Sequence, residues 1–425
     1  MREEEEMRSR IEHIILLAAV VFLLAHFFTA HQGVLVSSER SVLAYYRYWY
    51  NITLTVQGDV SDVKDINQLV IFPNTTRQTV LLEQALCLID GKEVARKSLT
   101  SDENGNAVLA FDFTPNDLKN GSILTLYFRV TIIQRTVSLE APIGNIRNAS
   151  LNEVPSGLTN FYVNNEWPIP GEIYDLSREL AGSFDKVFDV LNAFATWIEN
   201  NVAYPLSREV RDVIGPQYPN ETFQKRVGDC DDSSILFITM CRAVGIPSFL
   251  QLGGIPQLSI SEEVTAYKGN YIHRSKGIGW HAWSMVFFPG VGWLPVDLTY
   301  FSGARLELAY NGTVGYIKSP LGLISRIRFS AYFIANPIIY ANFSSLKYVD
   351  EARCWEKAMV EGRIKYIGTE ELVALISRVS IPIEIPLILA CIFLVLVLLT
   401  YFKFKAKKVI LKETYWITRY VEFVI

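Results

Sequence analysis

The sequence predicts an α+β protein, in which a β-sandwich precedes a mixed domain and two apolar segments flank them both. Three observations support this fold class. Alternating strand patterns fill the first third of the chain, helical periodicity follows, and strand patterns then return. The 425 residues, half of them hydrophobic, are enough for two or three domains with buried cores.

Charge and cysteine content exclude several classes of function. The net charge of −4 provides no basic field that would attract nucleic acid, and no nucleic-acid-binding motif is present. The five cysteines are too few and too scattered for a disulfide scaffold or for paired zinc ligands. The sequence does not decide whether Cys87 and Cys354 form a single disulfide. We therefore expect no nucleic acid partner, no metal and no cofactor.

Two apolar segments indicate a membrane protein. Residues 14–30 are interrupted only by His26 and are at the short end for a spanning helix. A signal peptide is the alternative, but residues 28–30 offer a small side chain at only one end of a cleavage site, which favours an uncleaved anchor. Residues 385–402 are uncharged and are followed by four lysines between residues 403 and 408, which places the carboxyl terminus in the cytoplasm.

Glycan acceptor sequences test this topology independently. Seven N-x-[ST] sequences lie between the apolar segments and none lies in either tail, whereas composition alone would give about two or three. Because acceptors face outward, we expect residues 31–380 to be extracytoplasmic. A polar ectodomain that is simply rich in Asn and Thr is the alternative reading, and it implies the same side. The acceptors are Asn51, Asn74, Asn120, Asn148, Asn220, Asn311 and Asn342.

The amino-terminal region has the pattern of short strands. Residues 41–56 alternate strictly between the two faces of a half-buried strand. Turn sequences such as Asp90-Gly91 and Asn104-Gly105 separate the later runs. Regular spacing of short strands predicts a β-sandwich of immunoglobulin-like type. The later strand-like runs are 69–72, 79–89, 107–113 and 123–136.

The pattern changes after about residue 150. Residues 183–203 carry apolar side chains at helical spacing, and a second helix over 230–244 begins after Asp229 as its N-cap. Strand patterns return at 249–252, 280–288 and 293–298, which makes this domain α+β. The charged residues 346–380 predict a helical stalk that leads to the second apolar segment.

Cys230 is a candidate nucleophile. At the first turn of a helix, unpaired N–H groups and the helix dipole favour a thiolate. Asp229, Asp231 and Asp232 oppose this effect because adjacent carboxylates raise a thiol pKa, so the thiol needs a base. A lone cysteine in a helix is more often an inert buried residue, as we expect for Cys241. The three aspartates could bind calcium, but a helix start explains them more simply.

The candidate base is His281, and Asp297 is its candidate partner. If the loop at 289–291 joins the two strands with an odd number of residues, Asp297 falls opposite Trp283 and diagonal to His281, with Cβ atoms about 7–8 Å apart. Asp297 would then fix the imidazole tautomer and stabilise the imidazolium. A histidine in an aromatic strand is more often a core residue, so the hypothesis rests on all three side chains together.

These residues resemble known motifs. Segments 228–232 (GDCDD) and 242–247 (RAVGIP) resemble the cysteine motif of the transglutaminase-like superfamily, and 281–283 (HAW) with 292–299 (GWLPVDLT) resemble its histidine and aspartate motifs. The resemblance covers about residues 180–300. It implies a papain-like core, no cofactor, and a thioester passed from an amide to an amine or to water.

The resemblance also implies a role for each residue. Cys230 attacks the carbonyl, His281 is general base and then acid, and Asp297 orients it. The N–H of Cys230 contributes to the oxyanion hole, with Gln224 a weak candidate for the second donor. Ser284-Met285 stands where Val-Glu is common and Leu298 where Pro is frequent, which leaves substrate preference open.

We therefore expect a membrane-anchored, extracytoplasmic thiol enzyme of archaeal or bacterial type that acts on protein or peptide substrates at the cell surface. The alternatives are a non-catalytic adhesion or scaffold protein that retains the fold, and a processing protease tethered only by the second apolar segment. The expected organisation is a cytoplasmic tail (1–10), an anchor or signal peptide (11–31), the sandwich (36–150), the catalytic domain (170–305), a membrane-proximal region and stalk (306–380), a transmembrane helix (381–402) and a basic cytoplasmic tail (403–425).

Overall fold

The amino-terminal strands form two antiparallel sheets in the computed structural model, which describes residues 42–206, 215–308 and 314–377. Strands β1-β7-β3-β4 lie in one sheet and β2-β6-β5 in the other. Their apolar faces share one core, to which Leu54, Phe111 and Leu126 contribute. The strands are β1 (Val42–Val56), β2 (Gln68–Ile71), β3 (Gln78–Ile89), β4 (Lys92–Glu93), β5 (Arg96–Ser101), β6 (Ala107–Phe111) and β7 (Ile123–Arg135).

The expected sandwich is present, but the prediction that it is of immunoglobulin-like type is wrong. In the immunoglobulin arrangement the first strand pairs with the second, whereas β1 here pairs with β7 on one side and with β15 (Ile364–Ser377) on the other. The alternation predicted for β1 is confirmed, because from Ala44 to Val56 every even-numbered side chain except Tyr50 is buried, whereas no odd-numbered one is. Asp90 and Gly91, both with positive φ, form the expected tight turn between β3 and β4.

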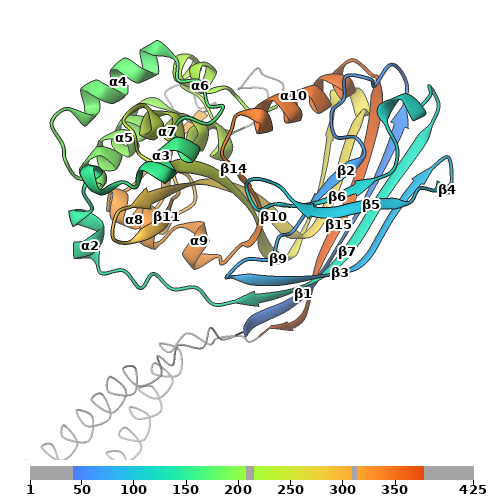
Figure 1. Cartoon of the computed structure of the whole chain (residues 1–425), viewed down its shortest axis with the longest axis horizontal. Coiled ribbons are helices and arrows are strands. Elements are labelled where there is room, and N and C mark those ends of the chain that lie inside the picture. Colours follow the sequence, from blue (N-terminus) through green and yellow to red (C-terminus); the bar gives the residue numbers. More distant parts are fainter. Residues whose placement is uncertain (1–41, 207–214, 309–313, 378–425) are drawn as a thin grey trace, which may run out of the picture. The chain divides into compact units, whose positions relative to one another are not determined.

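One sheet connects the sandwich strands to those of the second region. Its order is β14-β9-β10-β15-β1-β7-β3-β4, and β11 pairs with β10 outside this path. β10 pairs antiparallel with β9 and β11 and parallel with β15 (Figure 1). The strands are β9 (Ser248–Ala266), β10 (Tyr271–Phe288), β11 (Gly292–Val296) and β14 (Ile338–Phe343).

The helical stalk expected over 346–380 is only partly helical. Helix α10 covers Lys347–Val360, and Ile364–Ser377 is then strand β15, an interior strand of the large sheet. Ile364, Glu370 and Leu372 are buried on one face of β15, a period of two that favours a strand over a helix. The charged composition concealed this alternation, because buried Glu370 occupies an inward position.

Helices cover the β10–β11 hairpin and form a second core. Figure 1 shows α4, α5 and α7 grouped on one side of β9 and β10. Phe194 of α5, Phe237 of α7 and Phe288 of β10 are buried in this core. The helices predicted at 183–203 and 230–244 are confirmed as α5 and α7. The helices are α2 (Ile143–Asn148), α3 (Ser156–Tyr162), α4 (Gly171–Ala181), α5 (Val187–Asn201), α6 (Pro219–Lys225), α7 (Cys230–Ala243), α8 (Leu323–Arg328) and α9 (Ala331–Ile334).

A small sheet closes the region beside α5. Its strand order is β12-β13-β8, with antiparallel pairing throughout. Lys318 at the end of β13 donates to the carbonyl oxygen of Glu199 at 3.1 Å, which attaches this sheet to the last turn of α5. The strands are β8 (Tyr204–Pro205), β12 (Arg305–Leu308) and β13 (Val314–Lys318).

Several sequence predictions concern the membrane, disulfides and glycans. The predicted anchor (11–31), transmembrane helix (381–402) and both tails lie outside the described residues. Among the helices of the described residues, none has the length and apolarity to cross a bilayer. Cys87 and Cys354 are both free thiols, so the disulfide left open between them does not form. The side-chain amide of Asn342, an expected glycan acceptor, donates to the backbone carbonyl of Asn104 at 3.3 Å.

Candidate active site

Helix α7 begins at Cys230 and its first turn is firmly anchored. Asp229 is the N-cap, and the carboxylate of Asp232 reaches back to the N–H of Asp229 at 3.2 Å in a capping box. Gln217 donates its backbone and side-chain N–H groups to Asp232 at 2.7 and 2.8 Å. A Cβ on Gly228 would lie 2.8 Å from that of Asp232, so only glycine fits here. The aspartate cluster therefore has the helix-start role that the sequence favoured.

The β10–β11 hairpin brings Asp297 to His281. Its loop has three residues, 289–291, and the register ends with Ser284 opposite Val296, directly before Asp297, which agrees with the odd-loop alternative. Nε2 of His281 and Oδ2 of Asp297 are 3.0 Å apart, and both side chains are buried. The predicted hydrogen bond between these two residues is confirmed.

Backbone donors fix the carboxylate of Asp297. Its Oδ1 accepts the N–H groups of Thr299 at 3.1 Å and Tyr300 at 2.9 Å, and its Oδ2 accepts that of Ala331 at 3.1 Å. With four donors around it, the carboxylate has no freedom to rotate away from the imidazole. Nε2 of His281 is therefore held by Asp297, which leaves Nδ1 as the nitrogen available to a thiol.

The thiol of Cys230 lies against the strand that carries His281. The backbone N–H of Ala282, the residue after His281, is close enough to the sulfur to lower the pKa of the thiol. Cys230 and Ala282 also belong to one apolar cluster. Two residues further along β10, the hydroxyl of Ser284 donates to the carbonyl of Ser234 in α7 at 3.3 Å. The start of α7 and the histidine strand are therefore directly connected.

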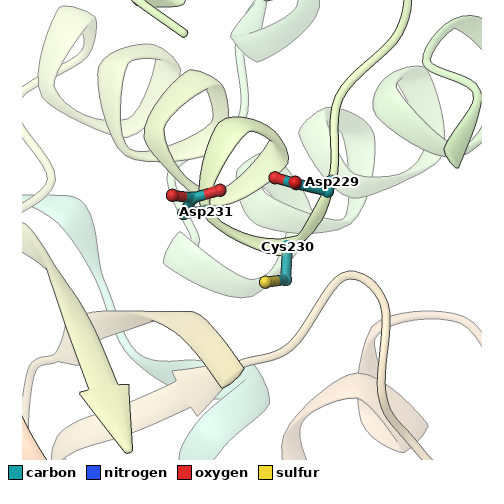
Figure 2. Close-up of side chains that lie close together, drawn as sticks. All are labelled: Asp229, Cys230 and Asp231. Atoms are coloured by element: carbon teal, nitrogen blue, oxygen red, sulfur yellow. The ribbon is translucent and has the colours of Figure 1, made fainter. Parts of the chain in front are cut away.

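Burial raises the pKa of the Cys230 thiol well above its ordinary value, and the charges of Asp229 and Asp231 raise it further. The N–H of Ala282 acts in the opposite direction. Figure 2 shows the two carboxylates on either side of the cysteine at the first turn of α7. The helix terminus therefore does not produce a thiolate unaided, and the thiol requires a base, as the sequence predicted.

The same cluster is the one group of described residues close enough to hold a metal ion. Donor atoms of Asp229, Cys230 and Asp231 lie within 4.8 Å of one another. However, Asp231 already accepts the hydroxyl of Tyr348 at 2.9 Å, and a thiol with a raised pKa is a poor metal ligand at neutral pH. The arrangement fits a helix start with a protonated thiol better than a metal centre.

Some supporting residues were missed by the sequence analysis. Arg326 of α8 is buried and donates to the carbonyl of Leu298 at 2.8 Å and to Glu199 at 2.5 Å, which holds the chain just after Asp297. The region 301–345 gave no clear pattern, although an arginine in an apolar stretch was a signal. Gln224, the weak oxyanion candidate, is exposed on α6.

Comparisons with known proteins find a family model that covers the candidate site. Residues 174–298 match the family model of the transglutaminase-like superfamily, and this stretch contains Cys230, His281 and Asp297. This part of the chain is therefore a transglutaminase-like core. The comparison with curated proteins gives no match.

The solved structures that match this chain are distant in sequence. A candidate cysteine protease from Cytophaga hutchinsonii is 14% identical over 80% of this chain and 93% of that chain, with a TM-score of 0.43. The periplasmic domain of TgpA from Pseudomonas aeruginosa is 14% identical over 61% of this chain and 89% of that chain, with a TM-score of 0.26. Red sea bream transglutaminase is 11% identical over 60% of this chain and 46% of that chain, with a TM-score of 0.23.

Proposed function

We propose that the protein is a transglutaminase-like thiol enzyme that transfers or hydrolyses the acyl group of an amide in a protein or peptide. The observation that carries this proposal is the buried pair of His281 and Asp297, 3.0 Å apart, where His281 lies on the strand that packs against Cys230 through Ala282. Three backbone N–H groups that fix the carboxylate of Asp297 indicate that the orientation of the imidazole matters.

The first half of the reaction forms a thioester. Nδ1 of His281 takes the proton of the Cys230 thiol as the sulfur bonds to the carbonyl carbon of the amide. The resulting oxyanion is stabilised by the N–H of Cys230, which has no partner within its helix because it belongs to the first turn. The imidazolium then gives its proton to the departing amine, the C–N bond breaks, and the acyl group stays on the sulfur.

The second half regenerates the thiol. Water or an amine attacks the thioester carbonyl, and His281 removes a proton from this nucleophile. The C–S bond breaks and the sulfur recovers its proton from the imidazolium, so the enzyme ends unchanged. Asp297 stabilises the imidazolium in both halves without taking up a proton itself.

We further propose that the enzyme is membrane-anchored and faces outward, with a cytoplasmic carboxyl terminus. The apolar residues 14–30 and 385–402 and the glycan acceptor sequences between them support this placement. The substrate is then a protein or peptide at the cell surface, and the lipid bilayer is the permanent partner.

The test uses the full chain in detergent with a glutamine-containing peptide and a fluorescent amine, and it records both amine incorporation and ammonia release. Cys230→Ala and His281→Ala should each lower turnover by about 10³-fold or more, because both remove a member of one catalytic unit. Cys354→Ala removes another partly exposed thiol and should leave turnover unchanged. Turnover that survives Cys230→Ala, or its absence from the parent chain across a library of amide substrates, would favour the non-catalytic scaffold.

A further inference from the structure

A cavity of about 710 Å³ lies between helix α10 and the strands of the large sheet. Figure 1 shows α10 above the ends of β1 and β15. On one side Ile52 and Leu54 of β1 line the cavity, and on the other side Trp355 and Met359 of α10 do so. A space of this volume accommodates a small ligand or several residues of a peptide.

One wall of the cavity adjoins the candidate active site. Tyr348, near the start of α10, lines the cavity, and its hydroxyl donates to Asp231 at 2.9 Å, next to Cys230. Leu252 also lines the cavity and packs in the same apolar cluster as Cys230. A chain bound in the cavity would therefore have one end close to the thiol.

The lining carries a strong excess of negative charge. Lys347 is its one basic residue, and the ammonium of Lys347 is 2.9 Å from Glu166, which lies outside the lining. The ammonium of Lys347 also acts electrostatically on Glu103 and Glu351, so one cation is shared among the carboxylates of the lining. Those carboxylates are Asp65, Asp102, Glu103, Glu351 and Glu356.

Two of these carboxylates, those of Asp65 and Glu351, repel each other electrostatically. Burial raises the pKa of Glu351, and the like charge of Asp65 raises it further, while Lys64 and Lys347 act in the opposite direction. Asp65 accepts the side-chain N–H of Gln68 at 2.8 Å, and Asp102 accepts two backbone N–H groups of its own turn. A bound cation would relieve the repulsion between Asp65 and Glu351.

Aromatic rings form much of the remaining wall. Behind them the carboxylate of Glu370 is buried and accepts the indole N–H of Trp280 at 2.8 Å and a hydrogen bond with His273 at 2.9 Å. Aromatic faces combined with carboxylates are the surroundings that attract ammonium and guanidinium groups. The rings of the wall belong to Tyr50, Tyr271, Tyr340, Phe343, Trp355 and Tyr366.

We infer that this cavity binds a basic segment of the protein substrate, with a lysine or arginine side chain placed between Asp65 and Glu351. The inference rests on the proposed function only in that the bound segment would lead the substrate to Cys230. The negative charge, the aromatic rings and the volume of the cavity favour a basic occupant. The Tyr348–Asp231 hydrogen bond places one wall of the cavity next to the first turn of α7.

The test measures binding without turnover. The full chain with Cys230→Ala is titrated with a fluorescent lysine-containing peptide and with the same peptide carrying norleucine, which keeps the length and removes the charge. The lysine peptide should bind about tenfold more tightly, and Asp65→Asn with Glu351→Gln should remove this difference, as the loss of two partly exposed ion pairs predicts. Glu93→Gln with Asp175→Asn, at exposed positions outside the cavity, is the matched control and should change nothing.

Equal affinity for both peptides, or full affinity in the double cavity variant, would overturn the inference. This failure is distinct from failure of the proposed function. A chain whose turnover depends on Cys230 but which does not prefer the basic peptide refutes only the cavity assignment. A chain without turnover that still distinguishes lysine from norleucine refutes only the enzyme.

Discussion

Replacing Asp297 with asparagine keeps the size of the side chain and converts one carboxylate oxygen into an amide nitrogen. The remaining oxygen can still accept the N–H groups of Thr299 and Tyr300, but the new NH₂ group then faces two donors, the N–H of Ala331 and Nε2 of His281. The imidazole avoids this clash by moving its proton to Nδ1. The nitrogen that should accept the thiol proton is then already occupied.

Two magnitudes follow from this geometry. The wrong tautomer should lower kcat by about 10⁴-fold, the loss seen when the orienting carboxylate of a triad becomes an amide. The buried N–H of Ala331, left without an acceptor, should lower the free energy of unfolding by about 1–3 kcal/mol. Steady-state kinetics with a glutamine peptide and urea denaturation measure the two effects, with exposed Asp175→Asn as control. If Asp297→Asn keeps kcat within about tenfold of the parent, Asp297 supports only the fold and the reasoning is refuted.

Three further predictions concern charge, exposure and the support of the site. Burial, and after it the neighbouring carboxylates, raise the thiol pKa of Cys230, so the rate of its alkylation by iodoacetamide should increase up to alkaline pH. Asp231→Asn should lower that pKa and move the pH–rate profile to lower pH. A profile that this variant leaves unchanged contradicts the prediction. Cys241 is fully buried and should label more slowly, as mass spectrometry of the two peptides would show; equal labelling would end the claim of an accessible thiol. Arg326→Met leaves Glu199 without its buried partner and should lower the free energy of unfolding by about 3–5 kcal/mol. Adding Glu199→Met to this variant should restore part of the loss. A loss below about 1 kcal/mol in urea denaturation would show that the pair is dispensable.

Local sequence patterns were sufficient to predict most of the strands and the two main helices. The alternation in 41–56 and the turn at Asp90-Gly91 correspond directly to β1 and the β3–β4 turn. Local patterns do not specify which strands pair over long distances. The pairing of β1 with β15, more than 300 residues later, excludes the immunoglobulin arrangement, and no short segment contains this information. Buried Glu370 made β15 look solvent-exposed, because its hydrogen bonds to Tyr48 and Trp280 come from other strands.

The candidate site was predictable to the extent that it depends on one hairpin and one helix terminus. The three-residue loop at 289–291 determined the face of Asp297, and the N-cap determined the position of Cys230. Backbone donors such as the N–H of Ala331 leave no trace in side-chain identity, so they could not be found in advance. Tyr348 was hidden for a related reason, since its contact with Asp231 joins segments more than 100 residues apart.

The most direct test of the central claim is to capture the acyl-enzyme. The full chain is mixed with an activated ester of a glutamine-like acyl group, quenched in acid, and analysed by intact mass and peptide mapping. The account predicts one acyl group on Cys230 that hydroxylamine removes, that does not form in Cys230→Ala, and that forms much more slowly in His281→Ala. Acylation of Cys354 at an equal rate, or a Cys230 adduct whose formation does not depend on His281, would contradict it.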